Sequence, residues 1–194
     1  MTLEIQFSGL HTVISGGQTG ADQGGLLAAY DFRLRTGGTA PAGYRTATGP
    51  NPLLEILGLK HGGDYRFRTQ QNIRDSDGTV LIAHDPLSSG SALTRALAAR
   101  AQKPCLVLSV RDLVTAVARE QSALTNERID EVAELGNRLA TFIRTSGIGT
   151  LNVAGNREIS TSTSVLPMTF VTRWIVGVAL ESLQSAQELR RIEP

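Results

Sequence analysis

The sequence predicts an α/β domain in which helices cover a central parallel sheet. Short apolar stretches alternate along the chain with longer segments of helical periodicity. Helices of this length between strands imply right-handed crossovers, which make neighbouring strands parallel. Neither a break in composition nor an internal repeat divides the 194 residues, so we expect one domain over residues 1–194.

The N-terminal part supplies the first two predicted strands. HTVIS at 11–15 has the apolar character of a short buried strand, and a glycine-rich turn follows it. Asp22 then opens a helix that continues to about Tyr30. FRLRT at 32–36 fits a second strand, so this part is expected to form a strand–helix–strand unit.

Residues 37–63 have no regular pattern. Gly, Pro, Thr and Asn are frequent there, and one helical turn is expected near Leu53–Leu57. We expect an irregular excursion, and an insert of this length is more often functional than idle. Helix formers return at 64–76, and GTVLIA at 78–83 is a strand.

The C-terminal half continues the alternation. A helix at 88–102 begins with serines that can cap it, and KPCLVLSV at 103–110 is the next strand. The segment 125–147 is a long amphipathic helix, because apolar residues recur at helical spacing: Ile129, Val132, Leu135, Leu139 and Phe142. GTLNVAG at 149–155 is the last strand, and 165–191 is the last helix.

Composition excludes several classes of protein. Hydrophobic residues make up 41% of the chain and charged ones 19%, which is typical of soluble globular proteins. Lys and Arg number 19 and Asp and Glu 18, a net charge of +1, so nonspecific binding of nucleic acid is not expected. The start MTLEIQFSGL lacks the features of a signal peptide, and no apolar run is long enough to span a membrane, so we expect a cytoplasmic protein.

The cysteine and the histidines give little evidence of a disulfide, a metal site or a catalytic group. Cys105 is the single cysteine, which excludes an internal disulfide, and its apolar strand favours a buried structural thiol over a reactive one. His11, His61 and His84 lie far apart without metal-ligand spacing, so we predict no metal site. His84 follows a strand and is the one candidate general base among them, although a loop histidine without function is the alternative.

Three loops should meet at one edge of the sheet. They are SGGQTGAD at 15–22, HDPLSSGSALT at 84–94 and AGNREISTSTS at 154–164, and each follows a predicted strand. In parallel sheets, ligands bind beyond the carboxyl ends of the strands, where loops lead into helix N-termini. Free backbone N–H groups and the helix dipole stabilise a phosphate or similar oxyanion there. We therefore predict an anion or nucleotide pocket.

The glycine-rich stretch does not match the familiar phosphate-binding motifs. GGQTGAD is neither the GxGxxG of dinucleotide-binding domains nor the GxxxxGK[ST] of Walker-type ATPases. Tight packing of a strand against a helix is the alternative explanation for its glycines. The predicted ligand-binding residues are Gly16, Gly17, Gln18, Thr19, Gly20, Asp22, Arg68, Ser89, Gly90, Ser91, Thr94, Asn156, Arg157 and Glu158.

The role of Asp22 stays open between structure and function. An acid in the first helical turn often serves only as a cap or a partner of the helix dipole. Such a carboxylate would repel a phosphate, but it could accept a hydrogen bond from a ligand hydroxyl or ring N–H, or hold a loop arginine. Both kinds of role are consistent with its position in the sequence.

Arginine is the bidentate partner of phosphate and carboxylate groups. We expect Arg68 and Arg157 in the pocket and Arg66 in solvent. Asp75 and Asp77 precede a strand, and one of them is expected to serve as a turn or cap residue.

Several motifs follow one another along the chain: ISGGQTGAD (14–22), GGTAPAGYRTATGPNP (37–52), DYRFRTQQNIRDSDGTVLI (64–82), SGSALT (89–94), KPCLVL (103–108) and LNVAGNREIS (151–160). Together they resemble the molybdenum cofactor carrier family over most of the chain. Ile159 stands where that family often runs directly from Arg-Glu to Ser. The resemblance implies a Rossmann-like three-layer sandwich, a homo-oligomer, and binding of the molybdenum cofactor (molybdopterin), a phosphorylated pterin dithiolene that carries oxo-molybdenum.

The larger superfamily includes nucleoside-monophosphate phosphoribohydrolases, which suggests an enzymatic alternative. Those relatives look similar in an arginine eight residues before Ser-Asp, here Arg68 before Ser76-Asp77. Their Gly-Gly-x-Gly-Thr-x-Glu-Glu element is replaced by LSSGSALTRAL at 87–97, which has no glutamate. A carboxylate stabilises the oxocarbenium-like state of N-glycosidic cleavage, so Asp22 or Glu158 would have to substitute.

We therefore expect a binding protein without turnover, a molybdenum cofactor carrier that holds a small phosphorylated ligand at the carboxyl edge of the sheet. The alternatives are a nucleotide-processing hydrolase and a nucleotide-ligand sensor. The last helix is expected to belong to the core, although Phe170, Trp174 and Val178 could instead form a dimer surface, by analogy with the expected oligomer.

Overall fold

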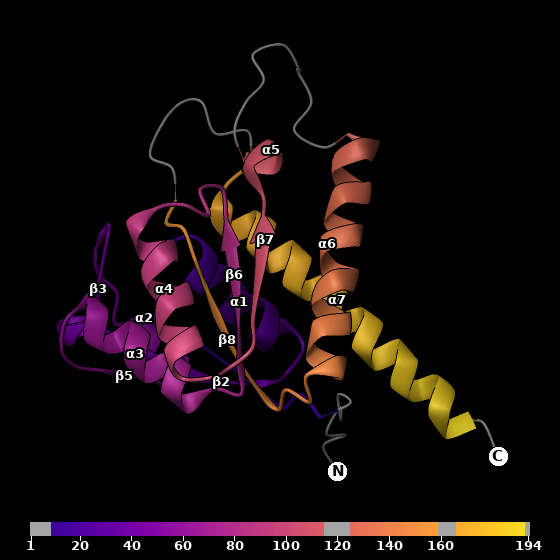
Figure 1. Ribbon diagram of the computed structural model, residues 1–194, viewed down its shortest axis with the longest axis horizontal. Helices are drawn as coiled ribbons and strands as arrows, with labels where there is room; N and C mark the ends of the chain where they lie inside the picture. Colours follow the sequence, from indigo (N-terminus) through magenta and orange to yellow (C-terminus); the bar gives the residue numbers. More distant parts are fainter. Residues whose placement is uncertain (1–8, 115–124, 159–165, 193–194) are drawn as a thin grey trace.

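A six-stranded sheet forms the middle layer of the computed structural model (Figure 1), which describes residues 9–114, 125–158 and 166–192. The strands lie in the order β5-β2-β1-β8-β6-β7, and each neighbouring pair is parallel. Their bounds are β1 (Thr12–Ser15), β2 (Arg35–Ala40), β5 (Leu59–His61), β6 (Gly78–Ala83), β7 (Cys105–Ser109) and β8 (Thr150–Gly155). The central strands β1, β8 and β6 are therefore direct neighbours.

Helices cover the two faces of this sheet. On one face, α7 packs against both α1 and α6, and on the other α3 packs against α4 (Figure 1). The bounds of these helices are α1 (Ala21–Asp31), α3 (Tyr65–Asp75), α4 (Ser89–Arg100), α6 (Asn126–Thr145) and α7 (Met168–Ile192). The predicted three-layer α/β sandwich with a parallel sheet is thus confirmed.

The main hydrophobic core lies between the sheet and the α1, α6 and α7 layer. Alternate residues of the central strands, such as Val13, Val80 and Val153, point into it and are fully buried. From α7, Ile175 and Leu183 join the same core. Burying these aliphatic side chains stabilises the fold by about 1.5–3 kcal/mol each relative to exposure, which fixes the sheet on which the loops stand.

The second strand was predicted too early in the chain. Phe32 still donates its N–H to Ala28 O, and Arg33 has φ 58°, so the chain turns at 32–34 and β2 begins only at Arg35. The glycines that suggested an irregular stretch belong to β2 itself. Gly38 has φ 119°, and a Cβ there would collide with the backbone of Ser15, so the position requires glycine.

The excursion at 37–63 is also more ordered than predicted. It contains the end of β2, a 3₁₀ turn η1 (Ala42–Tyr44), a hairpin of β3 (Arg45–Thr46) and β4 (Gly49–Pro50), and the edge strand β5. The expected helical turn is present as α2 (Leu53–Ile56). A small separate core holds this region to the sheet, formed by Leu26, Ala40, Leu54 and Leu59.

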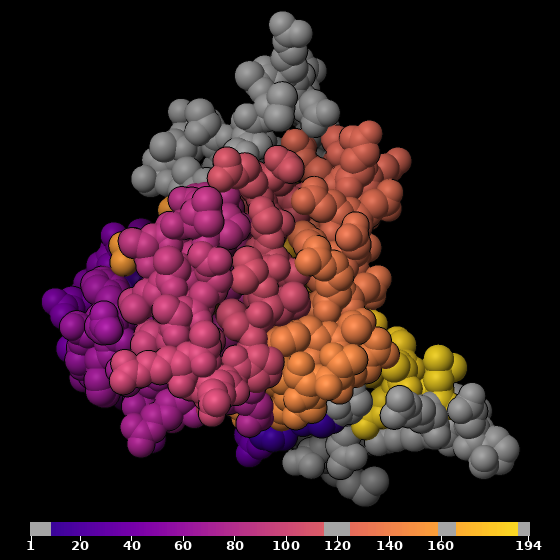
Figure 2. Space-filling model, in the orientation of Figure 1, coloured from indigo at the N-terminus to yellow at the C-terminus, as the bar shows by residue number. Residues whose placement is uncertain are grey.

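The last helix is partly core and partly surface. Ile175, Ala179 and Leu180 are buried, whereas Phe170 is 43% exposed. Trp174 and Val178 are partly buried and, with Phe170, line a shallow groove of about 340 Å³. Figure 2 shows the C-terminal part of α7 extending past the end of α6. Self-association through this face stays a prediction.

Two further expectations concern the burial of Cys105 and the presence of a membrane-spanning helix. Cys105 is only partly buried, less than predicted, and burial raises the pKa of its thiol against a lowering contribution from Arg95. At neutral pH the thiol therefore stays protonated, as a structural cysteine would. Within the described ranges, no helix combines the length and the apolar character that crossing a membrane would require. The short helix α5 (Arg111–Val114) follows β7.

Of the two acids that precede β6, Asp77 rather than Asp75 is the capping residue, and substitutions at the two positions test this assignment. Oδ2 of Asp77 accepts hydrogen bonds from the N–H groups of Gly149, at 3.0 Å, and Thr150, whereas the carboxylate of Asp75 accepts from the Gln71 side chain on an exposed helix face. Asp77→Ala should lower the free energy of unfolding by about 1 kcal/mol, because two backbone donors at the start of β8 lose their acceptor. Urea unfolding monitored by circular dichroism measures the change.

Asp75→Ala is the matched control, and it should change the free energy of unfolding by less than about 0.5 kcal/mol. Equal effects of the two substitutions would contradict the assignment.

Candidate functional site

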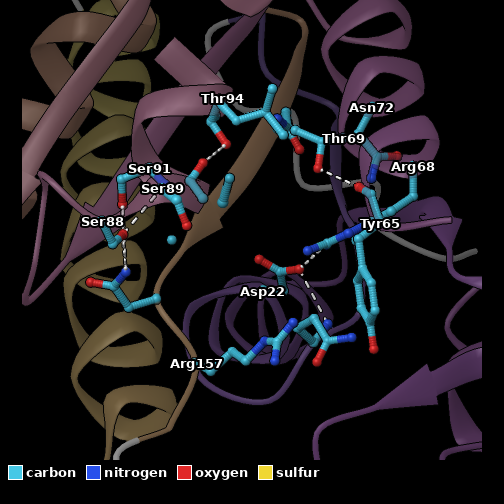
Figure 3. A pocket seen from close by; sticks show the side chains of 18 of the residues that line it. Asp22, Tyr65, Arg68, Thr69, Asn72, Ser88, Ser89, Ser91, Thr94 and Arg157 are labelled. Carbon is cyan, nitrogen blue, oxygen red and sulfur yellow. Dashed lines mark hydrogen bonds and ion pairs between the residues drawn. The ribbon is translucent and has the colours of Figure 1, made fainter. Parts of the chain in front are cut away.

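The loops after β1, β6 and β8 enclose a cavity of about 570 Å³ at the carboxyl edge of the sheet (Figure 3). Because these strands are neighbours, segments far apart in the sequence meet there. Most of the predicted site residues line the cavity: Gly16, Gln18, Asp22, Arg68, Ser89, Gly90, Ser91, Thr94, Asn156, Arg157 and Glu158. Gly17, Thr19 and Gly20 do not line it. In the third loop, residues 159–164 lie outside the described part of the chain.

Gly17 and Gly20 serve packing rather than ligand access. Gly17 has φ 72°, and a Cβ there would stand 2.7 Å from a methyl group of Leu54. Gly20 has φ 92°, and a Cβ there would stand 2.5 Å from the carbonyl oxygen of Asn156. The packing explanation therefore describes these two glycines, which bring the first loop against α2 and the third loop.

Gly16 makes room for an ion pair. Arg68, from α3, reaches over Gly16 and places its Nη1 2.5 Å from Oδ2 of Asp22. A Cβ at position 16 would coincide with the Arg68 guanidinium. The side chain of Asp22 is 3% exposed and that of Arg68 16%, so the pair is largely shielded from water. Of the roles left open for Asp22, holding an arginine is the one that the structure shows.

Asp22 also fixes the turn before α1. Its Oδ2 accepts the N–H of Gln18 at 3.1 Å, in addition to Arg68. Gln18 in turn binds the β3–β4 hairpin, donating from Nε2 to Arg45 O and accepting from Ala47 N–H at Oε1. The first loop is thus connected through two side chains to α3 and to the hairpin.

Asn156 joins the three loops to one another. Its Oδ1 accepts the N–H of Asp85 at 2.8 Å, and its Nδ2 donates to the hydroxyls of Ser88 and Ser91. Its carbonyl accepts the N–H of Ala21, the first residue of α1. Because its side-chain amide is used in these contacts, Asn156 acts by positioning the other loops around the cavity.

The N-terminus of α4 lies at the cavity. Ser88 caps this helix by accepting the N–H of Ser91, while Ser89 and Gly90 occupy the first two helical positions. Among the described residues, neither the N–H of Ser89 nor that of Gly90 has a hydrogen-bond acceptor. Both residues are exposed and line the cavity. Uncommitted N–H groups at the positive end of a helix dipole are suited to an anion.

Glu158 has a structural role that the sequence did not reveal. Its two carboxylate oxygens each accept a backbone N–H from the start of α7, Met168 and Thr169, at 2.7 Å. The hydroxyl of Thr169 then contacts both backbone groups of Gly20. Both oxygens of Glu158 are therefore engaged, and its charge is stabilised by the N-terminus of α7.

One face of α3 lines the cavity, and most of it was missed from the sequence. Tyr65, Thr69 and Asn72 join Arg68 there, at the three- and four-residue spacing that places side chains on one side of a helix. That spacing was the available signal. Asn72 binds the backbone of Thr39 in β2 through both amide atoms, which fixes α3 on the sheet. Arg66, outside this face, is exposed as predicted.

Arg157 lies on the rim of the cavity and is exposed. Its guanidinium stands over the ring of Tyr65, with the Cζ 5.1 Å from the ring centroid, a cation–π contact. Figure 3 shows Arg157 directed toward Tyr65 and away from α4. In the described part of the chain no carboxylate forms an ion pair with Arg157, so its positive charge is available to a ligand.

His84 also lines the cavity, on the loop after β6. Burial lowers the pKa of its imidazole, Asp85 counteracts this in part, and Arg111 reinforces it. The ring is therefore mainly neutral near pH 7, the form in which an imidazole could accept a proton. A role as general base stays a prediction.

The fold and the cavity define a Rossmann-like α/β protein with a polar cavity at the carboxyl ends of its central strands. The model of the "Circularly permutated YpsA SLOG family" matches residues 13–172, and the chain belongs to this family. The predicted resemblance is thereby confirmed at the level of the family.

One solved structure extends this comparison. The chain is similar to a crystal structure named "Putative molybdenum carrier protein", from Syntrophus aciditrophicus SB, with 29% sequence identity and a TM-score of 0.71. The similarity covers 90% of this chain and 98% of that one, so the two share their fold over nearly their whole length. Among curated proteins, no sequence matches this chain.

Gly16→Ala tests the space that the ion pair needs. The φ of Gly16 is not in the left-handed region, so alanine there causes no backbone strain. The new methyl group must, however, displace the Arg68 guanidinium. The buried carboxylate of Asp22 then loses its cationic partner, and the free energy of unfolding should fall by about 2 kcal/mol. Urea unfolding at pH 7 is the measurement.

Gly90→Ala is the matched control, because a Cβ there meets no heavy atom within 4 Å. Its free energy of unfolding should stay within about 0.5 kcal/mol of the wild-type value. If the Gly16→Ala protein were as stable as Gly90→Ala, the Asp22–Arg68 ion pair would not depend on glycine at position 16.

Proposed function

We propose that this protein binds and carries a small phosphorylated ligand, the molybdenum cofactor being the candidate, in the cavity at the carboxyl edge of the sheet. The observation that carries the proposal is the pair of uncommitted N–H groups at the start of α4, on Ser89 and Gly90, in a cavity that also holds Arg157. The name of the Syntrophus structure supports the choice of cofactor.

The residues present fit the organic part of this cofactor better than its metal. The N-terminus of α4 would hold the phosphate, and amide and hydroxyl side chains would meet polar ring edges. The single cysteine, Cys105, lies in β7 and does not line the cavity, so the chain supplies no thiolate there. The molybdenum would keep the dithiolene of its own pterin, and the protein would bind the group without exchanging its sulfur ligands.

The direct test mixes the purified protein with molybdenum cofactor and separates bound from free by gel filtration. Bound pterin is then quantified by its fluorescence after oxidation. We expect stoichiometric elution of the pterin with the protein. Elution of no more pterin than with an unrelated α/β protein would refute the carrier function.

Ser89→Pro tests the proposed phosphate site by deleting a single N–H group. Proline is tolerated at the first helical position, and Ser88 already has the extended backbone (φ −54°, ψ 153°) that precedes proline well. The variant should fold normally and bind a phosphorylated ligand about fivefold more weakly, because one anion-binding hydrogen bond is lost. Titration calorimetry with GMP measures the affinity.

Ser89→Ala is the control, since it removes the hydroxyl and keeps the N–H. It should bind GMP nearly as the wild type does. If both variants bind GMP as tightly as the wild type, the phosphate does not lie at α4.

A second candidate function, nucleotide hydrolysis, is favoured by one observation about Asp22. Only its Oδ2 is engaged, and its Oδ1 has no donor among the described residues. Asp22 lines the cavity, whereas both oxygens of Glu158 are bound to α7. Of the two carboxylates that could stabilise an oxocarbenium-like state, only Asp22 has a free oxygen.

Incubation with a panel of nucleoside monophosphates, with chromatography of the released base, distinguishes the two functions. A hydrolase should release base, and Asp22→Asn should abolish the release while Asp31→Asn, which alters an exposed ion pair with Arg173, leaves it intact. Binding of the nucleotides without any released base would exclude the hydrolase and leave the carrier function standing.

A further inference from the structure

We infer that the cavity recognises a planar heterocyclic ring, and that Tyr65 supplies the surface on which this ring stacks. The inference rests on the proposed function and narrows its ligand class to phosphorylated heterocycles such as nucleotides or pterins. It adds a residue that decides specificity to a site that otherwise selects for an anion.

Tyr65 is placed as a stacking platform. It is the first residue of α3, is 42% exposed and lines the cavity, so packing in the core does not explain this large aromatic side chain. The helix start beneath it is well fixed, because Asp64 caps it by accepting the N–H of Phe67 at 2.7 Å. An exposed aromatic ring in such a cavity is the usual surface for stacking a base.

Arg157 marks the face of the ring that a ligand would use. Its planar guanidinium already lies over Tyr65, 5.1 Å from the centroid, on a side chain that is itself exposed. A flat heterocycle can take the same position, because it offers a π surface of larger area to the same ring. Arg157 would then move aside, and its charge would be free to pair with an anionic or carbonyl group of the ligand.

The distribution of groups across the cavity fits a ligand with two chemically different ends. In Figure 3, Ser88, Ser89 and Ser91 lie at one side and Tyr65 at the other, with Asp22 between them. The side with the serines carries the N–H groups suited to a phosphate, and the side with Tyr65 carries the aromatic ring. Asp22 could accept a hydrogen bond from hydroxyl or N–H groups in the middle of such a ligand.

The test compares GMP with ribose 5-phosphate, two probes that share the phosphate and differ in the heterocycle. Titration calorimetry gives both dissociation constants for the wild type and for Tyr65→Ala, Tyr65→Phe and Arg157→Ala. Tyr30→Ala is the matched control, because Tyr30 is 65% exposed and does not line the cavity. Circular dichroism confirms that each variant is folded.

We expect the wild type to bind GMP at least tenfold more tightly than ribose 5-phosphate. Tyr65→Ala should remove this preference without changing the affinity for ribose 5-phosphate, while Tyr65→Phe and Tyr30→Ala keep it. Arg157→Ala should weaken both probes and keep the preference, because the ring of Tyr65 remains.

Three results would overturn the inference. Equal wild-type affinities for the two probes, which need no variant to measure, would show that the ring is not recognised while phosphate binding stands. A tenfold preference that persists in Tyr65→Ala would place the recognition of the ring elsewhere. Binding of neither probe would refute the phosphate site of the proposed function and this inference with it.

Discussion

The buried ion pair between Asp22 and Arg68 is the interaction on which the cavity depends. It joins the start of α1 to α3, two elements on opposite faces of the sheet, and it does so where the first loop leaves β1. Removing two charges from water costs several kcal/mol per ion, which only a short contact and further hydrogen bonds can offset. Here the contact is 2.5 Å, and the N–H of Gln18 adds a second donor to Asp22. The absence of a side chain at Gly16 is what permits this approach.

Most of the polar side chains around the cavity are engaged with the protein itself. Asn156 holds the second loop and the start of α4, Glu158 holds α7, and Asn72 holds β2. These hydrogen bonds connect the loops to one another and to the neighbouring elements. Among the described residues, the groups that remain for a ligand include the N–H groups at the start of α4, the charge of Arg157, the free oxygen of Asp22, the imidazole of His84 and the ring of Tyr65.

The sequence allowed the fold to be predicted more completely than the site. The apolar runs of β1, β6 and β8 identified the central strands to within a residue, because buried parallel strands need continuous hydrophobic stretches. The edge of the sheet was harder: β2 contains TGGTA, whose glycines resemble a loop, and they are there because Gly38 lies against the backbone of Ser15. Close backbone approach is a property of the tertiary structure and has no local pattern.

The roles of the residues within the site were harder to predict from the sequence, for a related reason. Residue type predicted that Glu158 and Asn156 would be near the cavity, but whether a carboxylate faces a ligand or caps a helix depends on where α7 begins in space. The hydroxyl-rich loop at α4 was predicted correctly as a helix start because capping leaves a local signature. Tyr65 was not predicted, although its three-residue spacing from Arg68 puts both on one face of α3, and its exposure in the cavity is known only from the structure.

The free energies of the two competing contacts decide whether a heterocyclic ring could displace Arg157 from Tyr65. A cation–π contact at an exposed site contributes about 0.5–1 kcal/mol. Stacking of a base on an aromatic side chain contributes about 1–3 kcal/mol, so the exchange is favourable even before the released guanidinium finds a new partner. The guanidinium can then pair with the anionic ligand, a charge-assisted bond stronger than the contact it left. The cation–π contact at the rim would therefore offer little resistance to an entering ring, and the same arginine would reinforce binding once the ring is in place.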